Sequence, residues 1–290
     1  MTGLIEIASD HLSAAINPLG AELTRLRDAQ GRELMTNADP AFWTGHAPIL
    51  FPIVGRLNGD ALHVDGTEYP MKQHGFARRR DFALVSQDAA GATFRLTDDA
   101  ETRAAYPFAF ALEIGFQISF STLAIAVRIA NPGAVPLPAS LGFHPAFAWP
   151  LPYGEPREDH RIVFEKAELG ALVALADGLA TPDPRPSPLD GTTLPLTDAV
   201  FEQDALIWNP VQSRTVTYGA SQGPQLRVDF PHTDKLGIWT KPGAAFVCIE
   251  PWHGIADPQG FTGDFREKPG VFEVAPGESW SCEMRVTLTA

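Results

Sequence analysis

The fold is indicated most clearly by two neighbouring runs, Phe110-Ala-Leu-Glu-Ile-Gly-Phe-Gln-Ile118 and Thr122-Leu-Ala-Ile-Ala-Val-Arg-Ile129. Apolar residues recur in them at about every second position, which is the period of a half-buried β-strand. The short gap between the runs predicts an antiparallel pair in the core of a sheet. A membrane span is not expected here, because polar residues interrupt the stretch and a span needs roughly 18 or more apolar residues.

The same two-residue period continues along most of the chain. Leu62–Asp65 and Thr67–Tyr69 predict a hairpin with an Asp-Gly turn at Gly66. The one helix expected covers about residues 98–105 and ends before Pro107. Further strands are expected at residues 82–85, 92–96, 161–164, 214–218, 225–230, 246–249 and 282–288.

Many short strands with turn signals between them predict an all-β, mostly antiparallel sandwich or barrel. The 25 glycines and 26 prolines follow no period and therefore act as turn residues. Segment 177–195 contains five prolines and is predicted to be an extended surface insertion. Because strands are expected on both sides of it, residues 1–290 are predicted to form a single domain.

Composition excludes several classes of function. The 290 residues include 22 Lys and Arg against 35 Asp and Glu, a formal net charge of −13, whereas nucleic-acid binders usually carry a basic surface. The first residues lack the basic and apolar regions of a secretory signal. Cys248 and Cys282 are too few for a disulfide framework, so they are interpreted as buried residues of a cytoplasmic protein, with a bridge between them left open.

Familiar catalytic motifs are missing from the sequence, which holds no P-loop, no HExxH, no CxxC and no GxSxG. Three polar residues instead lie in apolar or glycine-rich surroundings. His74 lies in Gln-His-Gly-Phe-Ala-Arg (73–78), and His144 lies in Ser-Leu-Gly-Phe-His-Pro-Ala-Phe (140–147). Glu250 ends the apolar run Phe-Val-Cys-Ile-Glu-Pro-Trp (246–252).

Glu250 follows a run that is expected to be buried. Burial raises the proton affinity of a carboxylate, which suits a general base that works near neutral pH. The alternative is a buried ion pair, for which Arg56 and Arg78 are available.

The two histidines also have alternatives, since either could be a hydrogen-bonded core residue. Together with Glu250 they could form a metal shell of the cupin type. The intervals of 70 and 106 residues between His74, His144 and Glu250 give that interpretation no support, so no metal is expected. Several aromatic residues, among them Trp252 beside the acid, are of the kind on which a sugar face stacks.

Six stretches together resemble the aldose 1-epimerase (galactose mutarotase-like) superfamily, most closely its bacterial LacX-like branch. The resemblance covers about residues 4–288. Its carriers are Pro-Ile-Leu-Phe-Pro-Ile-Val-Gly-Arg-Leu (48–57), Gln-His-Gly-Phe-Ala (73–77), Leu-Gly-Phe-His-Pro-Ala-Phe (141–147), Asp-Ala-Leu-Ile (204–207), Gly-Ile-Trp-Thr-Lys-Pro-Gly-Ala (237–244) and Cys-Ile-Glu-Pro-Trp-His-Gly (248–254).

The resemblance implies a single-domain β-supersandwich and an aldose 1-epimerase that needs no cofactor. His144 matches the family's general acid, which protonates the ring oxygen, and Glu250 matches its general base, which takes the anomeric hydroxyl proton. Arg56, His74 and Asp204 match sugar-binding positions. The expected partner is a small-molecule sugar, with no nucleic acid and no membrane, and the expected state is a monomer or homodimer.

Two alternatives remain open at this point. Arg78-Arg79-Arg80 follows His74 closely, and such cations would suit a phosphorylated sugar, as in hexose-6-phosphate mutarotases. If the run starts a strand, alternate members point to solvent, and a neutral aldose is then the expected substrate. A non-catalytic carbohydrate-binding protein on the same fold is the other alternative, although binding alone needs neither an acid nor a base.

Overall fold

The two runs around residue 120 do form the centre of a large sheet. A computed structural model describes residues 3–289. In it, β9 (Ala111–Ser119) pairs antiparallel with β10 (Thr122–Ala130), and Ile114 lies opposite Val127. Their alternate residues are buried, as the period predicts.

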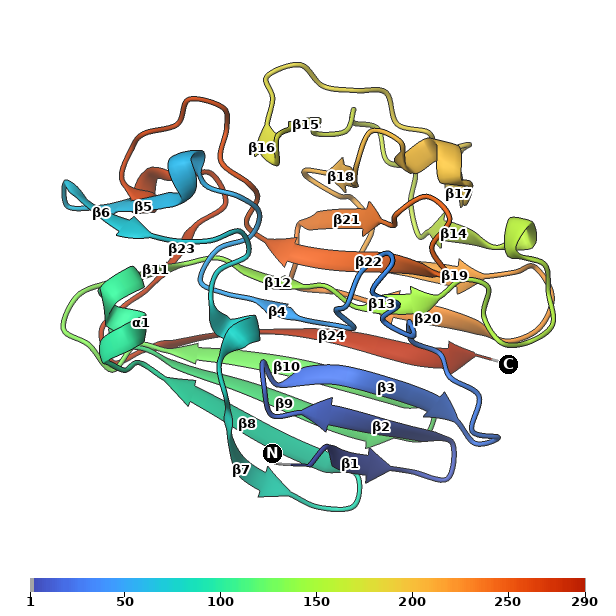
Figure 1. The fold of residues 1–290 in the computed structure, drawn as a ribbon. Coiled ribbons are helices and arrows are strands. Elements are labelled where there is room, and N and C mark those ends of the chain that lie inside the picture. The colour runs from blue at the N-terminus through green and yellow to red at the C-terminus, as the bar shows by residue number, and fades with distance from the viewer. Residues whose placement is uncertain (1–2, 290) are drawn as a thin grey trace.

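This large sheet has nine strands, and in Figure 1 it runs from the lower part of the picture, where β9 and β10 lie, up the right-hand side. All of its pairs are antiparallel, and the strands predicted at residues 82–85 and 92–96 pair with one another at one of its edges. In spatial order its strands are β17 (Thr193–Pro195), β14 (Arg161–Phe164), β19 (Thr215–Gly219), β20 (Gln225–Asp229), β24 (Ser279–Thr289), β10, β9, β8 (Gly91–Thr97) and β7 (Ala83–Gln87).

A second sheet of six strands lies above β9 and β10 in Figure 1. Its order is β18 (Leu206–Trp208), β21 (Lys235–Trp239), β22 (Phe246–His253), β12 (Leu141–Phe143) and β4 (Ile49–Leu50), with β13 (Ala146–Ala148) also paired to β22. The smaller sheets are β1 (Ile5–Ala8), β2 (Leu12–Asn17) and β3 (Glu22–Asp28); β5 (Ala61–Val64) and β6 (Thr67–Pro70); β11 (Leu137–Ala139) and β23 (Phe272–Val274); and β15 (Leu175–Ala176) and β16 (Leu179–Ala180).

The main hydrophobic core lies between the nine-stranded and the six-stranded sheet and contains side chains of both. Val247 and Ile249 of β22 belong to it, together with the buried residues of β9, β10 and β24. The alternate residues of β22 point to the other face of the smaller sheet, where Cys248 and Trp252 belong to two separate small clusters. The outer face of the six-stranded sheet therefore stays available for a site.

The expected helix is present as α1 (Ala100–Ala105). Asp99 caps it through a reciprocal capping box with Thr102, and this bonding satisfies the free amides of the first turn. Five 3₁₀ turns complete the structure: η1 (Asn58–Asp60), η2 (Ala77–Arg79), η3 (Arg157–Asp159), η4 (Asp198–Phe201) and η5 (Phe265–Glu267). No helix in residues 3–289 is of the length and apolarity that crossing a bilayer requires.

Three expectations need correction. Segment 177–195 is not wholly irregular, because it contains β16 and β17, and β17 joins the large sheet through Leu194 opposite Ile162. Residues 77–79 form a 3₁₀ turn and do not start a strand. Glu250 lies inside a strand that continues through Pro251 to His253, and does not end it. The question of a bridge is also answered, since Cys248 and Cys282 are both free.

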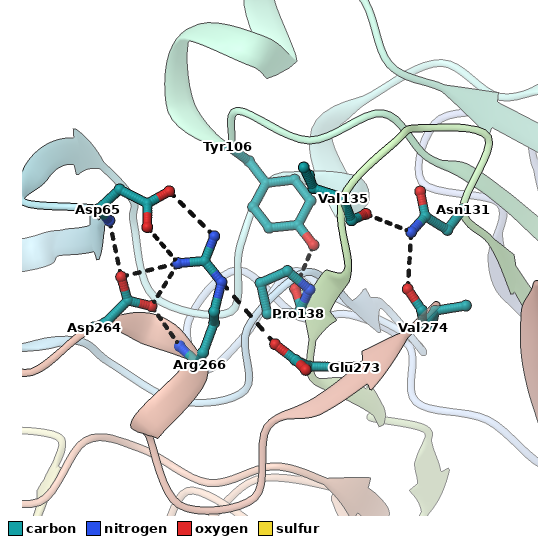
Figure 2. Close-up of polar contacts among 9 residues, drawn as sticks. All are labelled: Asp65, Tyr106, Asn131, Val135, Pro138, Asp264, Arg266, Glu273 and Val274. Carbon is teal, nitrogen blue, oxygen red and sulfur yellow. Dashed lines mark hydrogen bonds and ion pairs between the residues drawn. The ribbon is translucent and has the colours of Figure 1, made fainter. Parts of the chain in front are cut away.

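A group of polar contacts holds the loops at one end of the sandwich together (Figure 2). Arg266 binds the carboxylates of Asp65 and Asp264, and the Tyr106 hydroxyl donates to the carbonyl of Pro138 in β11. The buried amide of Asn131 donates to the carbonyls of Val135 and Val274, at 2.8 Å each. These bonds fix β11, which leads directly into β12 and residue 144.

We expect Asn131→Ala to destabilise the protein by about 2 kcal/mol, because it leaves the buried carbonyl of Val274 without its side-chain donor. Urea unfolding measures the loss as a lower transition midpoint. Asn17→Ala is the matched control, since the Asn17 amide only accepts an exposed bond from Leu19, and its cost should stay near about 0.5 kcal/mol. Equal midpoints for the two variants would contradict the role given to Asn131.

Candidate functional site

His144 and Glu250 lie opposite one another on neighbouring strands. Gly142 pairs with Trp252, and Ala146 pairs with Cys248, so the register places residue 144 directly across from residue 250. The His144 Nε2 and Glu250 Oε2 atoms are 3.2 Å apart. The residues are 8% and 2% exposed, so this pair is almost fully removed from water.

The surroundings of Glu250 favour its protonated form. Burial raises the pKa of its carboxyl well above the ordinary value, and the negative charge of Asp204 adds to the effect. The Trp252 indole N–H works in the opposite direction, although it does not meet hydrogen-bond geometry. Neither Arg56 nor Arg78 forms an ion pair with Glu250 in residues 3–289, so the predicted alternative of an arginine salt bridge is wrong.

His144 has the opposite preference for a proton. Burial lowers the pKa of its imidazole to about 3, and the nearby charge of Arg78 acts in the same direction. Trp43 stacks on the ring with centroids 4.9 Å apart, and Trp239 meets it edge-on. Because both members of the pair favour their neutral forms, one proton shared between them is the state that burial supports.

His74 is held as a hydrogen-bond donor toward the cavity. Its Nδ1 accepts a bond from the Gly55 amide at 3.1 Å, so the ring proton of the neutral form lies on Nε2. Burial keeps the pKa of His74 well below its ordinary value, and the charges of His144 and Arg78 add to this. The following residue, Gly75, must be glycine, because a Cβ there would lie 2.1 Å from the Phe51 carbonyl oxygen.

An inner cavity of about 400 Å³ opens onto this pair. Six of the seven predicted site residues line it: His74, Arg78, His144, Asp204, Glu250 and Trp252. Its other walls are residues that the sequence analysis did not assign to the site, namely Trp43, Gly55, Gln73, Leu175, Gly178, Ala205, Ile207, Trp239, Lys241 and Ala256. Trp43 and Trp239 are among the aromatic residues of the sequence, and Trp239 and Lys241 both lie in the motif 237–244, although neither was assigned a role there.

Arg56 is the predicted residue that does not line the inner cavity. It lies instead in an adjoining outer cavity of about 570 Å³, which also holds Lys72, Arg79 and Asp177. Its guanidinium binds the Asp60 carboxylate at 3.0 Å and the Asp177 carbonyl at 3.1 Å. Arg56 thus holds the β15–β16 hairpin over the site.

The basic run separates in three directions. Arg78 lines both cavities, and its buried Nε has no hydrogen-bond partner. Arg79 lines the outer cavity, and Arg80 turns away to bind Glu101 of α1 at 2.6 Å. Of the three arginines, Arg78 is therefore the one that lines the inner cavity.

Three residues that line the inner cavity carry buried polar atoms without partners: Nε of Arg78, Nδ1 of His144 and Nε1 of Trp252. Buried polar groups in native proteins are nearly always hydrogen-bonded. Several such groups around one cavity indicate a ligand that is rich in hydroxyl groups or other polar atoms.

The metal shell considered from the sequence is not the one that the structure assembles. Within residues 3–289, the cluster of possible metal ligands consists of His144, Cys248 and Glu250, whose ligand atoms lie within 4.8 Å of one another. His74 is not part of it. The cupin-like set of two histidines and a glutamate is therefore wrong in its composition.

The family model for aldose 1-epimerase matches residues 3–287, almost the whole described chain. The chain belongs to the aldose 1-epimerase family. It is 31% identical to the plasmid LacX protein of Lactococcus lactis subsp. lactis, over 98% of this chain and 99% of the relative. The resemblance read from the six motifs is thereby confirmed.

Solved structures agree with this membership of the family. A galactose mutarotase related enzyme from Lactobacillus acidophilus superposes with a TM-score of 0.91 at 30% identity, over 99% of this chain and 98% of that one. A galactose mutarotase-like protein from Lactobacillus casei gives 0.92 at 28% identity, over 99% and 100%. The predicted galactose mutarotase-like, all-β fold is confirmed.

Two glycines make room for Trp252 beside the acid. A Cβ on Gly237 would lie 2.6 Å from Cη2 of the indole, and one on Gly142 would lie 2.7 Å from its Cδ1. Gly237 is also the residue paired with Glu250 on β21. The indole can therefore lie across both neighbouring strands.

We expect Gly237→Ala to destabilise the protein by roughly 1–3 kcal/mol, because the new methyl group forces the indole of Trp252 to move. Gly115→Ala is the matched control in another strand, where the nearest atoms to a Cβ lie at 3.9 Å. That change should be neutral or stabilising by up to about 1 kcal/mol. Denaturant unfolding of both variants measures the difference, and equal stabilities would contradict the packing described for Trp252.

Proposed function

We propose that the protein is a mutarotase, which interconverts the α and β anomers of a free aldose. The proposal rests on the pair of His144 and Glu250, which are buried and lie opposite one another on neighbouring strands. They line a cavity whose other walls include aromatic and polar residues. Mutarotation needs a proton delivered to one oxygen of the hemiacetal carbon and a proton removed from the other. A basic and an acidic group side by side meet that need.

In the proposed mechanism, protonated His144 donates its proton to the ring oxygen while the Glu250 carboxylate takes the proton of the anomeric hydroxyl. The bond between C1 and the ring oxygen breaks, and the free aldehyde forms. After rotation about the C1–C2 bond, the hydroxyl adds to the other face of the aldehyde. Glu250 then returns a proton to the carbonyl oxygen and His144 recovers one from the ring hydroxyl, so the pair ends as it began.

Binding of the sugar would use the remaining groups of the inner cavity. The Nε2–H of His74 is available to donate to a sugar oxygen, and the exposed carboxylate of Asp204 is available to accept from hydroxyl groups. Trp43, Trp239 and Trp252 supply flat apolar walls against which the C–H face of a pyranose packs. We propose Arg78 as a further hydrogen-bond donor in this cavity.

A carbohydrate-binding protein without catalysis is the alternative of another class. It would use the same walls, but it would gain nothing from a carboxylate and an imidazole buried at 3.2 Å from one another. Polarimetry of freshly dissolved α-D-glucose and α-D-galactose separates the two functions. Faster decay of the optical rotation in the presence of the protein supports the mutarotase, and an unchanged decay contradicts it.

We expect Glu250→Gln and His144→Asn each to lower the mutarotation rate by on the order of 10²–10⁴, because each removes one proton transfer and keeps a polar side chain at the position. Glu158→Gln, a change at an exposed glutamate, is the control and should leave the rate unchanged. Polarimetry gives the rates, and sugar binding should change only a few-fold. Near wild-type turnover in Glu250→Gln would exclude Glu250 as the base.

The rate should depend on pH through a bell-shaped curve. Activity needs one proton on the His144–Glu250 pair. On the acid side the pair takes up a second proton and loses its base; the lowered pKa of His144 moves this limb downward. On the alkaline side it loses its only proton, and the raised pKa of Glu250 moves that limb upward. After subtraction of the spontaneous reaction, an acid limb near the ordinary histidine pKa of about 6.5, in place of one well below it, would contradict a shared proton.

We propose a neutral aldose as the substrate in preference to a hexose phosphate. The net charge of −13 opposes a dianion at long range, and Asp204 and Glu250 oppose it in the inner cavity. In the outer cavity the charge of Arg56 is already neutralised by Asp60. The charges of Arg78, Arg79 and Lys72 are those that remain there to attract a phosphate.

Catalytic efficiency should therefore be higher on glucose than on glucose 6-phosphate, and Arg78→Ala should lower both. Arg80→Ala is the control, since Arg80 binds Glu101 away from the cavities. A tenfold preference for the phosphate that is lost in Arg78→Ala and kept in Arg80→Ala would reverse this choice of substrate.

A further inference from the structure

Cys248 is a buried thiol beside the pair that the proposed mechanism does not use. It lies on the same face of β22 as Glu250, two residues earlier in the strand. Its partners on the neighbouring strands are Ala146 and Trp239, which carry no charge. The groups that can bind a cation beside the thiol are therefore those of His144 and Glu250.

We propose that His144, Cys248 and Glu250 form an inhibitory binding site for a zinc-type divalent cation. One imidazole nitrogen, the thiolate and one carboxylate oxygen lie within 4.8 Å of one another. Zinc binds such atoms at about 2.0–2.3 Å in a tetrahedron, so the three side chains need to close by about 1 Å around the ion. The fourth position faces the inner cavity, where water or a sugar oxygen completes the tetrahedron.

The donor set determines which cations fit. Sulfur and nitrogen ligands suit zinc and cadmium, whereas magnesium and calcium prefer oxygen ligands. The charges also balance, because a thiolate and a carboxylate together neutralise a doubly charged ion. A neutral assembly is the form that a buried site with apolar walls accepts at the least cost.

Binding releases protons into solution. The Cys248 thiol loses its proton as the sulfur–metal bond forms, and the His144–Glu250 pair loses its shared proton as both groups become ligands. Ligating histidines usually donate their second ring nitrogen to an acceptor, and the Nδ1 of His144 has no such partner. The bound ion is therefore inferred to be a reversible inhibitor and not a permanent cofactor.

Metal binding itself does not depend on the proposed function, whereas inhibition does. A bound ion occupies the imidazole and the carboxylate, so neither can transfer a proton to or from the sugar. Zinc should therefore slow mutarotation. EDTA should return the zinc-treated protein to its original rate, and it should not lower the rate of the untreated protein.

Cadmium is the direct probe, because a cadmium–thiolate bond absorbs in the near ultraviolet and needs no activity to be seen. Titration of the full chain with Cd²⁺ should produce this absorption up to one equivalent. Cys282→Ser should behave like the wild type, since Cys282 is a buried thiol of the main core on β24. Cys248→Ser should lose the absorption, and Cys248→Ala serves the same purpose should the serine variant not fold.

Glu250→Gln keeps the thiol but removes a proposed ligand, so it should lower the affinity for Zn²⁺. The loss should exceed the roughly 10–100-fold that removal of an outer-shell partner costs. Mg²⁺ at the same concentration should have no effect. Absence of the cadmium absorption in the wild type, or its persistence in Cys248→Ser, overturns the site. Absorption without any mutarotase activity keeps the site and rejects the proposed function, so the two failures are distinguishable.

Discussion

The register between β22 and its neighbours β12 and β13 is the constraint on which the candidate site depends. It places a carboxylate opposite an imidazole where water is nearly absent, and each group then loses its preference for being charged. A shift of β22 by one residue against its neighbours would point the Glu250 side chain toward the main core, because neighbouring residues of a strand point to opposite faces. The core side chains Val247 and Ile249 prevent such a slip, so the packing of the sandwich and the chemistry of the site share one cause.

Much of the fold could be predicted from the two-residue hydrophobic period alone. The strands that were not predicted have physical reasons for lacking that period. The hairpin of β9 and β10 alternates cleanly, since one face of it is core and the other is solvent. The strand Leu12–Asn17 escaped prediction because a register shift between Ala15 and Ile16 breaks its alternation. β21 escaped because it is buried on both faces, where a two-residue period no longer applies.

The candidate site could be predicted in part. His144 and Glu250 lie in strongly apolar contexts, and the family's motifs mark both positions. Their contact could not be read from spacing, because they are far apart in the sequence and only sheet pairing unites them. Arg56 illustrates the opposite case: its motif is marked, but the local carboxylate of Asp60 holds its guanidinium outside the inner cavity. Cys248 carried no signal of its own, since a buried thiol and a ligating thiol look alike in sequence.

The central claim is that the His144–Glu250 pair, with its single proton, accelerates both the opening and the reclosure of the sugar ring. Exchange NMR on glucose at anomeric equilibrium tests it most directly, since it observes both directions at once. With the wild-type protein, cross-peaks between the α and β anomeric protons are expected at mixing times at which glucose alone shows none. With Glu250→Gln the spectrum should match that of the sugar alone. Equal cross-peaks from both proteins, or none from the wild type, would contradict proton transfer by the His144–Glu250 pair.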